Sequence, residues 1–381
     1  MSRRIVYVTG TRADYGLMSR TLKLWDQSEV LNVSICVTGM HLLHHYGMTV
    51  HEIENDGLAI CARIETDLSQ TSGAAMAKAI AHGLEGMVDV FEIEKPDLVV
   101  VLGDRGEMLA GTLAAVHLNI PVVHIHGGER SGTIDESVRH AISKLAHYHF
   151  TSTELARERL INMGELPKNV FAVGAPGLDG LVSEAVATRE ELCGQVGFDP
   201  KGLVVLLVFH PVLQEAADAG KQMMNVLNAL ASFPLQVVCL MPNADAGGRL
   251  IETVIKEFKS QIKIGFHVFS HLARPQFISW MRHCDFMIGN SSSGIIEAAT
   301  FGAPVVNIGN RQFGRERCQN VIDVLAESHA IHAGIEQALR LRESHNEVLN
   351  LYGDGQAGQR MLKLLAELPL SADVMNKYNA Y

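Results

Sequence analysis

The sequence contains neither paired cysteines nor long apolar runs. Its six cysteines are scattered over 381 residues, and no two of them form a Cys-x-x-Cys pair. This spacing is typical of reduced thiols in a cytoplasmic protein. The apolar runs have the length of β-strands, far below the ~20 residues of a membrane-spanning helix. The run before Gly10 is also too short for a signal-peptide core. We therefore expect a cytoplasmic protein with no membrane partner.

Basic residues are also few. The chain has 32 Lys and Arg residues against 42 Asp and Glu residues, a formal charge of −10 with His neutral. A general nucleic-acid binder needs a basic face, so we expect no nucleic-acid partner, although a local arginine cluster could still hold a small anion. The hydrophobic content of 47% is that of a globular protein. At roughly 100–200 residues per domain, the length predicts two domains.

Short apolar, β-branched runs alternate with longer amphipathic stretches, and this pattern occurs twice. The strands predicted in the first half are Ile5–Thr9, Val33–Thr38, Leu98–Leu102, Val122–Ile125, His149–Thr151 and Val170–Val173. Those predicted in the second half are Leu203–Phe209, Gln236–Met241, Ile264–Phe269, Asp285–Ile288 and Val305–Ile308. Continuous apolarity marks strands that are covered on both faces. The predicted fold class is therefore α/β, with two Rossmann-like, doubly wound parallel sheets.

A polar stretch over residues 187–201 separates the two halves. We expect an N-terminal domain over 1–186 and a C-terminal domain over 187–356. A C-terminal helix over 357–381 is expected to pack back on the first domain. Ligands of open α/β sheets bind outside the carboxyl ends of the strands, so the loops that follow the strands are where chemistry is expected.

Two polar loops of the first half stand out. The first strand leads into Thr9–Gly16 (TGTRADYG), where a helix N-terminus and Arg12 could bind an anion. An ordinary strand–helix turn with a solvated arginine explains this motif equally well. Asp104 and Arg105 follow the strand Leu98–Leu102. Asp104 either caps the next helix or places a carboxylate at a ligand site beside Arg105.

The densest polar stretch covers residues 124–140. It contains His126, Glu129 and Asp135, three potential proton carriers near one strand end. The two glycines after His126 would let the backbone approach a ligand closely. His124 and His126 would share one face of a strand, but no partner residues complete a metal-ligand set. We therefore expect no metal.

The second half offers an anion site. Phe209-His210-Pro211 ends its first strand, which leaves His210 at the carboxyl end of the strand. Residues 289–298 (GNSSSGIIEA) place three serines and a glycine before a helix, and this suits a diphosphate. Glu297 suits the hydroxyls of a ribose, although a serine cap with a capping-box Glu is the simpler alternative. Arg311 could clamp a phosphate.

Together these motifs resemble the UDP-N-acetylglucosamine 2-epimerases, above all the hydrolysing branch, which makes N-acetylmannosamine and UDP for sialic acid synthesis. The matching runs are TGTRADYG, GDRGE, HIHGGERSGTIDESVRHAISKLAH, FHP, GNSSSGIIEA and GNRQFGRE, and they extend over nearly the whole chain. The resemblance implies a GT-B-like fold of two Rossmann-type domains with the site in the interdomain cleft. It also implies a homodimer or homotetramer, and a reaction that needs no cofactor.

The resemblance assigns roles to particular residues. The implied catalytic residues are Asp104, His126, Glu129 and Asp135. The implied substrate-binding residues are Arg12, Gly16, Arg105, His210, Asn243, Ser291, Ser292, Ser293, Gly294, Glu297 and Arg311. The family pattern I-E-G-G-E reads I-H-G-G-E here, over residues 125–129. Either His126 takes the proton-transfer role, or Glu129 takes it, or the substrate differs.

The implied reaction converts UDP-N-acetylglucosamine and water to N-acetylmannosamine and UDP, through elimination to 2-acetamidoglucal and hydration. Hydrolysing relatives that act on UDP-N,N′-diacetylbacillosamine give the 2,4-diacetamido-2,4,6-trideoxymannose precursor of legionaminic acid, so this sugar is an alternative substrate. Two other enzymes remain open, a non-hydrolysing epimerase and a GT-B glycosyltransferase that uses the same UDP site. A nucleotide-sugar sensor without activity would leave the acidic cluster unexplained.

Overall fold

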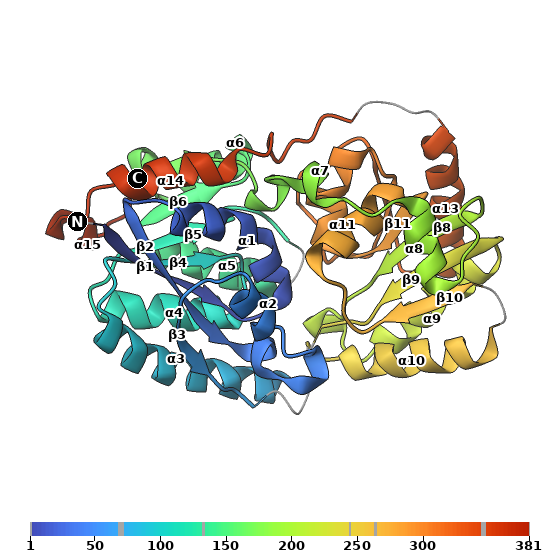
Figure 1. Cartoon of the computed structure of the whole chain (residues 1–381), viewed down its shortest axis with the longest axis horizontal. Coiled ribbons are helices and arrows are strands. Elements are labelled where there is room, and N and C mark those ends of the chain that lie inside the picture. The colour runs from blue at the N-terminus through green and yellow to red at the C-terminus, as the bar shows by residue number, and fades with distance from the viewer. Residues whose placement is uncertain are drawn as a thin grey trace. The chain divides into compact units, whose positions relative to one another are not determined.

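The computed structural model (Figure 1) describes residues 2–67, 72–131, 134–243, 245–262, 265–343 and 348–380. The chain divides into two compact units. Unit 1 comprises Met1–Glu129, Ile134–Asp179 and Tyr352–Tyr381, and unit 2 comprises Arg130–Thr133 and Gly180–Leu351. Each unit contains a parallel sheet with helices on both faces, so the predicted fold class is confirmed.

The sheet of unit 1 has seven parallel strands among the described residues, in the order β3-β2-β1-β4-β5-β6-β7. They are β1 (Arg3–Thr9), β2 (Leu31–Thr38), β3 (Ile60–Ile64), β4 (Leu98–Leu102), β5 (Val122–Ile125), β6 (Tyr148–Thr151) and β7 (Val170–Ala172). The strand order reverses between β1 and β4. Loops that follow these two strands therefore diverge at the carboxyl edge of the sheet, where ligands of such sheets bind.

Helices cover both faces of this sheet. They are α1 (Arg12–Asp26), α2 (Val50–Asn55), α3 (Gly73–Glu94), α4 (Gly106–His117), α5 (Ile134–Leu145), α6 (Glu154–Asn162), α14 (Ala357–Glu367) and α15 (Ala372–Met375). Successive residues of β1 point to opposite faces, as strand geometry requires. Tyr7 packs in a core with Trp25 of α1 and Met361 of α14, whereas Val8 packs in a second core with Met87 of α3.

The sheet of unit 2 has six parallel strands among the described residues, in the order β10-β9-β8-β11-β12-β13. They are β8 (Leu203–Val208), β9 (Leu235–Leu240), β10 (Phe266–Phe269), β11 (Phe286–Gly289), β12 (Val305–Ile308) and β13 (Val321–Val324). The helices are α7 (Leu181–Glu184), α8 (Arg189–Val196), α9 (Ala219–Ala231), α10 (Gly248–Gln261), α11 (Arg274–His283), α12 (Ser292–Ile296) and α13 (Ser328–Glu343). The order reverses between β8 and β11, so the carboxyl edge of this sheet is a second place for a ligand.

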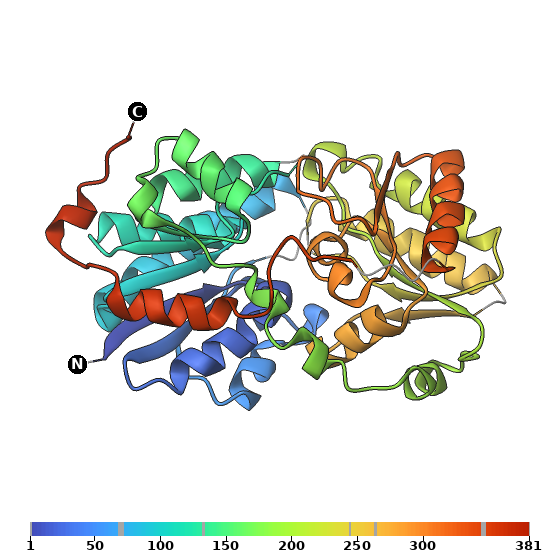
Figure 2. The same ribbon diagram turned by 90° about the horizontal axis from the view of Figure 1, so that it is seen from above.

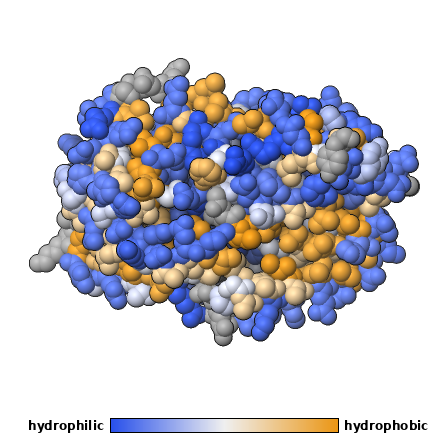
Figure 3. Space-filling model, turned by 180° about the vertical axis from the view of Figure 1, so that it is seen from behind, coloured by the Kyte–Doolittle hydropathy of each residue, from blue (hydrophilic) through white to orange (hydrophobic). Residues whose placement is uncertain are grey.

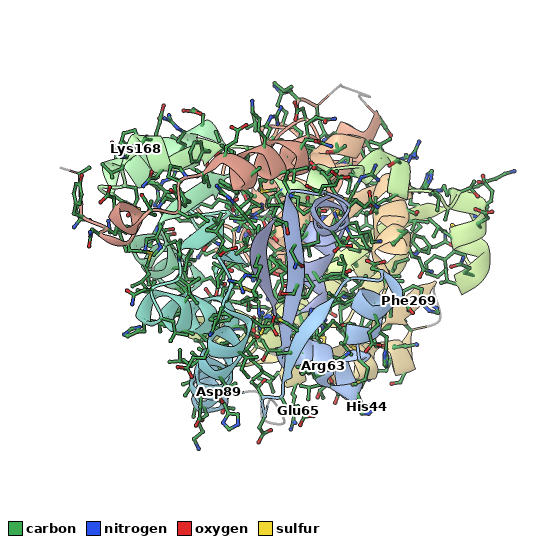
Figure 4. The ribbon with its side chains drawn as sticks, turned by 60° about the vertical axis from the view of Figure 1, so that its left-hand side comes forward. His44, Arg63, Glu65, Asp89, Lys168 and Phe269 are labelled. Atoms are coloured by element: carbon green, nitrogen blue, oxygen red, sulfur yellow. The ribbon has the colours of Figure 1, made fainter. Side chains whose placement is uncertain are left out.

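Of the four edge strands, β3, β7, β10 and β13, the sequence did not reveal β3 and β13. β3 and β13 carry half-exposed side chains and so lack the continuous apolarity of the central strands. Arg63 of β3 is labelled in Figure 4, and its Nη2 lies 2.7 Å from Oε1 of Glu54. A charged edge of this kind discourages pairing with another strand. Phe269, also labelled in Figure 4, ends β10 at an edge of the second sheet. Ile264, expected to begin β10, lies outside the described residues.

The surface mixes hydrophilic and hydrophobic residues. On the face drawn in Figure 3, hydrophobic patches lie between larger hydrophilic areas. Within the described part of the chain, none of the helices combines the length and the apolar character needed to cross a bilayer.

The polar stretch 187–201 was expected to separate the two halves of the chain, but it lies within unit 2. It contains α8, which begins with a capping box between Thr188 and Glu191. The first division between the units comes after Asp179, earlier than the expected boundary at 186, and the second comes after Leu351 rather than at 356. The segment after Asp179 joins unit 2 because Arg282 of α11 donates to the Ala185 carbonyl, 3.3 Å away.

The C-terminal segment was expected to be one helix over 357–381. The structure instead shows α14 and the short α15, because the chain turns at Leu368, the residue before Pro369. Figure 2 shows this segment, in red, beside the first part of the chain, in blue. α14 packs on α1, where Nε1 of Trp25 donates to the Gly358 carbonyl at 3.3 Å.

The end of the chain is fixed to unit 1 by a buried ionic cluster around Glu165. Its carboxylate lies 2.7 Å from Nζ of Lys377, 2.8 Å from Nζ of Lys144 and 3.0 Å from Nε2 of His149. Burial raises the pKa of Glu165, but the hydrogen bonds and charges of these three partners outweigh it and lower the pKa to about 2.

We predict that Glu165→Gln lowers the free energy of unfolding at neutral pH by about 3 kcal/mol, because the half-buried Lys144 and Lys377 lose the counter-charge of a buried carboxylate. The folded-state pKa lies below the ordinary value of 4.5, so this stabilisation is present above pH 4.5 and is lost as the pH falls toward 2. Urea unfolding should therefore show a gap between the two proteins that narrows over this range.

The control for this prediction is Glu154→Gln, which breaks a far more exposed ion pair, 2.7 Å long, with Arg157. This variant should lose less than about 1 kcal/mol. A gap between wild type and Glu165→Gln that did not change with pH would contradict the assignment.

Candidate active site

Asp104 lies in the loop that follows β4. α4 begins at Gly106, and its N-cap is Arg105, so Asp104 is not the helix cap that one interpretation predicted. Arg105 was also expected to hold Asp104, but its Nε lies 3.3 Å from the carboxylate of Glu107. The Asp104 carboxylate instead accepts a hydrogen bond from Nη2 of Arg139, a residue of α5.

Arg139 joins two loops of unit 1. The residue is only 1% exposed, and its Nη1 also donates to the carbonyl of Glu129, 3.0 Å away. A guanidinium carries several donors in a fixed planar arrangement, so one side chain can bind both groups at once. The loop after β4 and the loop after β5 are therefore held against the same residue of α5.

His126 and Glu129 form a second buried pair. β5 ends at Ile125, and His126 has a φ of +64°, in the left-handed region that non-glycine residues rarely adopt. The prediction that His124 and His126 share one face of a strand is therefore wrong. Nδ1 of His126 lies 3.4 Å from Oε1 of Glu129, which also accepts from the hydroxyl of Ser152. An imidazole beside a carboxylate, both 4% exposed, is suited to exchange a proton.

The two glycines after His126 were expected to make room for a ligand. Packing within unit 1 accounts for both instead. A Cβ on Gly128 would lie 2.3 Å from the carbonyl oxygen of Ala156 in α6, and one on Gly127 would lie 3.0 Å from Oγ of Ser143 in α5. The glycines therefore let the loop lie directly on α5 and α6.

Asp135 is in the first turn of α5, the helix that also carries Arg139. Its side chain is half-buried. The structure thus brings Asp104, His126 and Glu129 to the loops after β4 and β5, and it places Asp135 on the helix that holds these loops. Among the described residues, no group of three or more His, Cys, Asp or Glu side chains is arranged to hold a metal ion.

The loop after β1 was expected to offer backbone N–H groups and Arg12 to an anion, but the Asp14 side chain binds two of these N–H groups. Arg12 is the first residue of α1, and Gly16 lies farther along the same helix. The backbone N–H groups of Gly10 and Thr11 donate to Oδ2 of Asp14, at 3.2 and 2.8 Å. Asp14 therefore occupies donors that an anion would need, so anion binding here would depend on the Arg12 side chain. Burial lowers the pKa of Arg12, partly offset by the charge of Glu52.

In unit 2, Asn290 connects three of the loops at the carboxyl edge. It follows β11, and its side chain accepts from the His210 N–H at 2.7 Å and donates to the His210 carbonyl at 2.8 Å. His210 follows β8, and its Nδ1 accepts from the N–H of Asn243, which follows β9, at 3.4 Å. The Asn290 carbonyl accepts from Nη1 of Arg311 at 3.1 Å and from Nε2 of Gln312 at 2.9 Å. The Arg311 guanidinium therefore lies next to the serine loop.

The serine loop begins α12. Ser291 is the N-cap, and its Oγ accepts from the Ser293 N–H at 3.3 Å and contacts Oγ of Ser293 at 2.8 Å. α12 spans Ser292–Ile296 only, so its dipole is smaller than the expected longer helix would supply. Gly294 packs on β12, because a Cβ there would lie 2.9 Å from Cγ1 of Val305.

Glu297 follows the last residue of α12, so the capping-box interpretation is wrong. Its carboxylate is 2% exposed and accepts from Nη2 of Arg274 in α11. A carboxylate oriented by an arginine can still accept from the hydroxyl groups of a ligand. The implied nucleotide-binding residues of unit 2 thus come from the loops after β8, β9, β11 and β12.

Comparison with known proteins shows the family of the chain. The family model described as UDP-N-acetylglucosamine 2-epimerase matches residues 23–366. The chain belongs to the UDP-N-acetylglucosamine 2-epimerase family. It is 52% identical, over all of both chains, to the hydrolysing UDP-N,N′-diacetylbacillosamine 2-epimerase of Legionella pneumophila. It is 33% identical to the hydrolysing GDP/UDP-N,N′-diacetylbacillosamine 2-epimerase of Campylobacter jejuni, over 84% of each chain.

Solved structures show the same fold. The UDP-GlcNAc 2-epimerase of Neisseria meningitidis, bound to UDP-GlcNAc, superposes with a TM-score of 0.82 at 19% identity and covers 95% of this chain and 99% of its own. The enzyme of Methanocaldococcus jannaschii, in complex with UDP-GlcNAc and UDP, gives 0.79 at 18% identity, with coverages of 95% and 99%. The family and the GT-B-like fold that the motifs predicted are therefore confirmed.

Sequence reasoning missed the residues that hold the site together. Arg139 and Arg274 orient carboxylates, and Asn290 and Gln312 join loops. Arg139 left a usable signal, since it lies on the helix of Asp135 within the densest polar stretch, and Asn290 and Gln312 lie within the runs GNSSSGIIEA and GNRQFGRE. Arg274 lies outside every motif, and only the folded chain shows its partner.

We predict that Gly128→Ala destabilises the protein by about 3 kcal/mol or more, because the added Cβ meets a backbone oxygen at 2.3 Å and φ is +77°. Gly57→Ala is the matched control. Gly57 has a φ of +75°, but nothing lies within 4 Å of its Cβ position, so only the backbone cost of about 1 kcal/mol is expected. Urea unfolding of both variants compares the two, and equal losses would show that the loop is not tightly packed on α6.

Proposed function

We propose that this member of the family is a hydrolysing 2-epimerase that converts a UDP-linked 2-acetamido sugar and water to UDP and the free sugar with C2 inverted. The observation that carries the proposal is a set of proton carriers in unit 1, of which His126 and Glu129 are buried and Asp104 is half-buried. At the carboxyl ends of β4 and β5, Arg139 donates to the Asp104 carboxylate and to the Glu129 carbonyl. The Glu129 side chain in turn pairs with His126. The hydrolysing relatives support the reaction type.

The first step is an elimination. A base removes the proton from C2 of the sugar, and that electron pair forms a double bond between C1 and C2. The C1–oxygen bond breaks at the same time, and UDP leaves with its electron pair. The C2 proton is weakly acidic, so the base must be positioned within hydrogen-bond reach and tuned by burial. Asp104, His126, Glu129 and Asp135 are the candidates for this role.

The second step is hydration of the 2-acetamidoglucal. The oxygen of water bonds to C1, and a proton is delivered to C2 on the face opposite to the one that lost its proton. Inversion at C2 therefore needs two proton carriers on opposite faces of the sugar. A site with several carboxylates and an imidazole can supply both, and the I-H-G-G-E sequence gives one of these places to His126.

Unit 2 is proposed to hold the UDP. The diphosphate develops negative charge as it leaves, and oriented donors stabilise that charge. The proposed donors are Arg311, His210, Ser291, Ser292 and Ser293, at the loops that Asn290 connects. Glu297 is proposed to accept from the ribose hydroxyls. Further substrate contacts are proposed for Asn243, Gly294, Arg12, Gly16 and Arg105.

Two sugars fit this proposal. UDP-N-acetylglucosamine, the first expectation from the motifs, would give N-acetylmannosamine for sialic acid synthesis. UDP-N,N′-diacetylbacillosamine would give the legionaminic acid precursor. The second sugar has the support of the 52% identical relative, which matches over its full length, and of the Campylobacter relative. We propose it as the preferred substrate of a cytoplasmic homodimer or homotetramer.

The deciding experiment supplies both nucleotide sugars separately in heavy water and follows the products by NMR. We expect free sugar of the manno configuration, free UDP and one deuterium at C2, with the higher kcat/KM for the bacillosamine derivative. A released sugar without deuterium at C2 would contradict the elimination. A product that remains bound to UDP would show a non-hydrolysing epimerase instead.

We predict that Asp104→Asn and Asp135→Asn each lower kcat by about a thousandfold, as expected when a general acid or base is removed. UDP should still bind with unchanged affinity, because the nucleotide contacts are proposed for unit 2. Turnover assays and calorimetric UDP titration check the two halves of this prediction. If both variants kept most of their activity, neither carboxylate would be a proton carrier.

We predict that Glu297→Ala weakens UDP binding at least about tenfold, because hydrogen bonds to a charged group are lost. Glu327→Ala, at an exposed position that precedes α13, is the control and should leave UDP binding unchanged. Calorimetry on both variants gives the dissociation constants. Unchanged binding in Glu297→Ala would mean that this carboxylate serves only as the partner of Arg274.

A further inference from the structure

His124 is a buried histidine to which the proposed reaction assigns no role. It lies in β5 and is fully buried. Nε2 of the imidazole is 2.7 Å from the carbonyl oxygen of Gly103, and Nδ1 is 3.0 Å from Oγ of Ser143. A carbonyl oxygen can only accept, so Nε2 carries the hydrogen, and Nδ1 accepts from the Ser143 hydroxyl.

The ring is neutral when it makes these contacts. Burial lowers the pKa of His124 to about 3, although the hydrogen bond to Gly103 acts in the opposite direction. The two partners therefore fix one neutral tautomer, and the ring acts as a rigid spacer between the β4 loop and α5 rather than as a source of charge.

Each of these two contacts adjoins one partner of the Asp104–Arg139 ion pair. The Gly103 carbonyl immediately precedes Asp104 in the chain. Ser143 lies one helical turn after Arg139 on α5, and Arg139 is the residue that binds the Asp104 carboxylate. His124 and Arg139 thus connect the loop after β4 to the same face of α5 at two points.

The surroundings leave this connection little freedom. A Cβ on Gly127 would lie 3.0 Å from both Nδ1 of His124 and Oγ of Ser143, so the loop after β5 packs directly on the pair. The neighbouring buried histidine, His149, is in register with His124 on β6 but pairs with Glu165 instead. Burial of a histidine in this sheet therefore does not by itself produce a contact with the β4 loop.

We propose that His124 is a positioning residue that holds Asp104 at a fixed place relative to α5, the helix of Asp135 and Arg139. This inference rests on the proposed function, because it takes Asp104 as a proton carrier. A group that transfers a proton must be placed accurately, and a displacement of about 1 Å can cost about a hundredfold in rate. The hydrogen bond to the Gly103 carbonyl is the contact that sets this position.

Two substitutions separate the contacts. In His124→Gln the side-chain amide nitrogen reaches the place of Nε2 and can still donate to the Gly103 carbonyl. In His124→Asn the shorter side chain reaches only the place of Nδ1. We expect kcat of His124→Asn to fall about a hundredfold, with KM and the UDP dissociation constant within twofold of wild type. His124→Gln should recover most of that loss.

His149→Asn is the matched control, since it removes a buried histidine in register on the next strand. It should lower the melting temperature and leave kcat within twofold of wild type. If His124→Asn does not fold, Ser143→Ala replaces it, with an expected loss of about tenfold in kcat at unchanged KM.

Three results would overturn the inference. They are full kcat in His124→Asn or Ser143→Ala, no recovery in His124→Gln, and an equal loss of kcat in His149→Asn. Failure of the proposed function would differ, because the wild-type protein would then release no free C2-inverted sugar, whereas failure of this inference would leave wild-type turnover intact and change only the pattern among the variants.

Discussion

The arrangement of unit 1 depends on the buried guanidinium of Arg139. A charge that is 1% exposed would cost several kcal/mol to bury alone, so it needs partners that neutralise it and accept its hydrogens. The Asp104 carboxylate supplies the opposite charge, and the Glu129 carbonyl supplies an acceptor. Because these partners follow two different strands, the burial of one charge fixes the relative place of two loops that carry the proposed proton carriers.

In unit 2 a neutral side chain, that of Asn290, joins several loops in a similar way. Asn290 exchanges two hydrogen bonds with the backbone of His210, and its own carbonyl accepts from Arg311 and Gln312. An amide offers donors and an acceptor together, so it can join loops without adding charge. Asn290 therefore joins the loops after β8, β11 and β12 without neutralising the charge of Arg311, which the proposed binding of a diphosphate requires.

The sequence revealed the central strands and the polar loops that follow them, because both leave local signals. Continuous apolar runs marked β4, β5 and β12 at their observed bounds. The edge strands β3 and β13 left no such run, since solvent covers part of their side chains. Motifs also pointed to Asp104 and Glu297, but the arginines that orient them come from other elements. Such pairings depend on tertiary packing, which no local pattern encodes, and so does the left-handed backbone at His126.

The family resemblance implies a glutamate at the position of His126, and the histidine in its place has a physical consequence at this site. A carboxylate in that place would face Glu129 at a distance of about 3–4 Å, and two buried carboxylates so close cannot both ionise, which raises the pKa of one of them. An imidazole 3.4 Å from Glu129 instead gives a pair that is either neutral or of opposite charge. An imidazole in this place therefore avoids the burial of two like charges side by side. The backbone strain at His126 persists because the loop is held by the tight contact of Gly128 with α6.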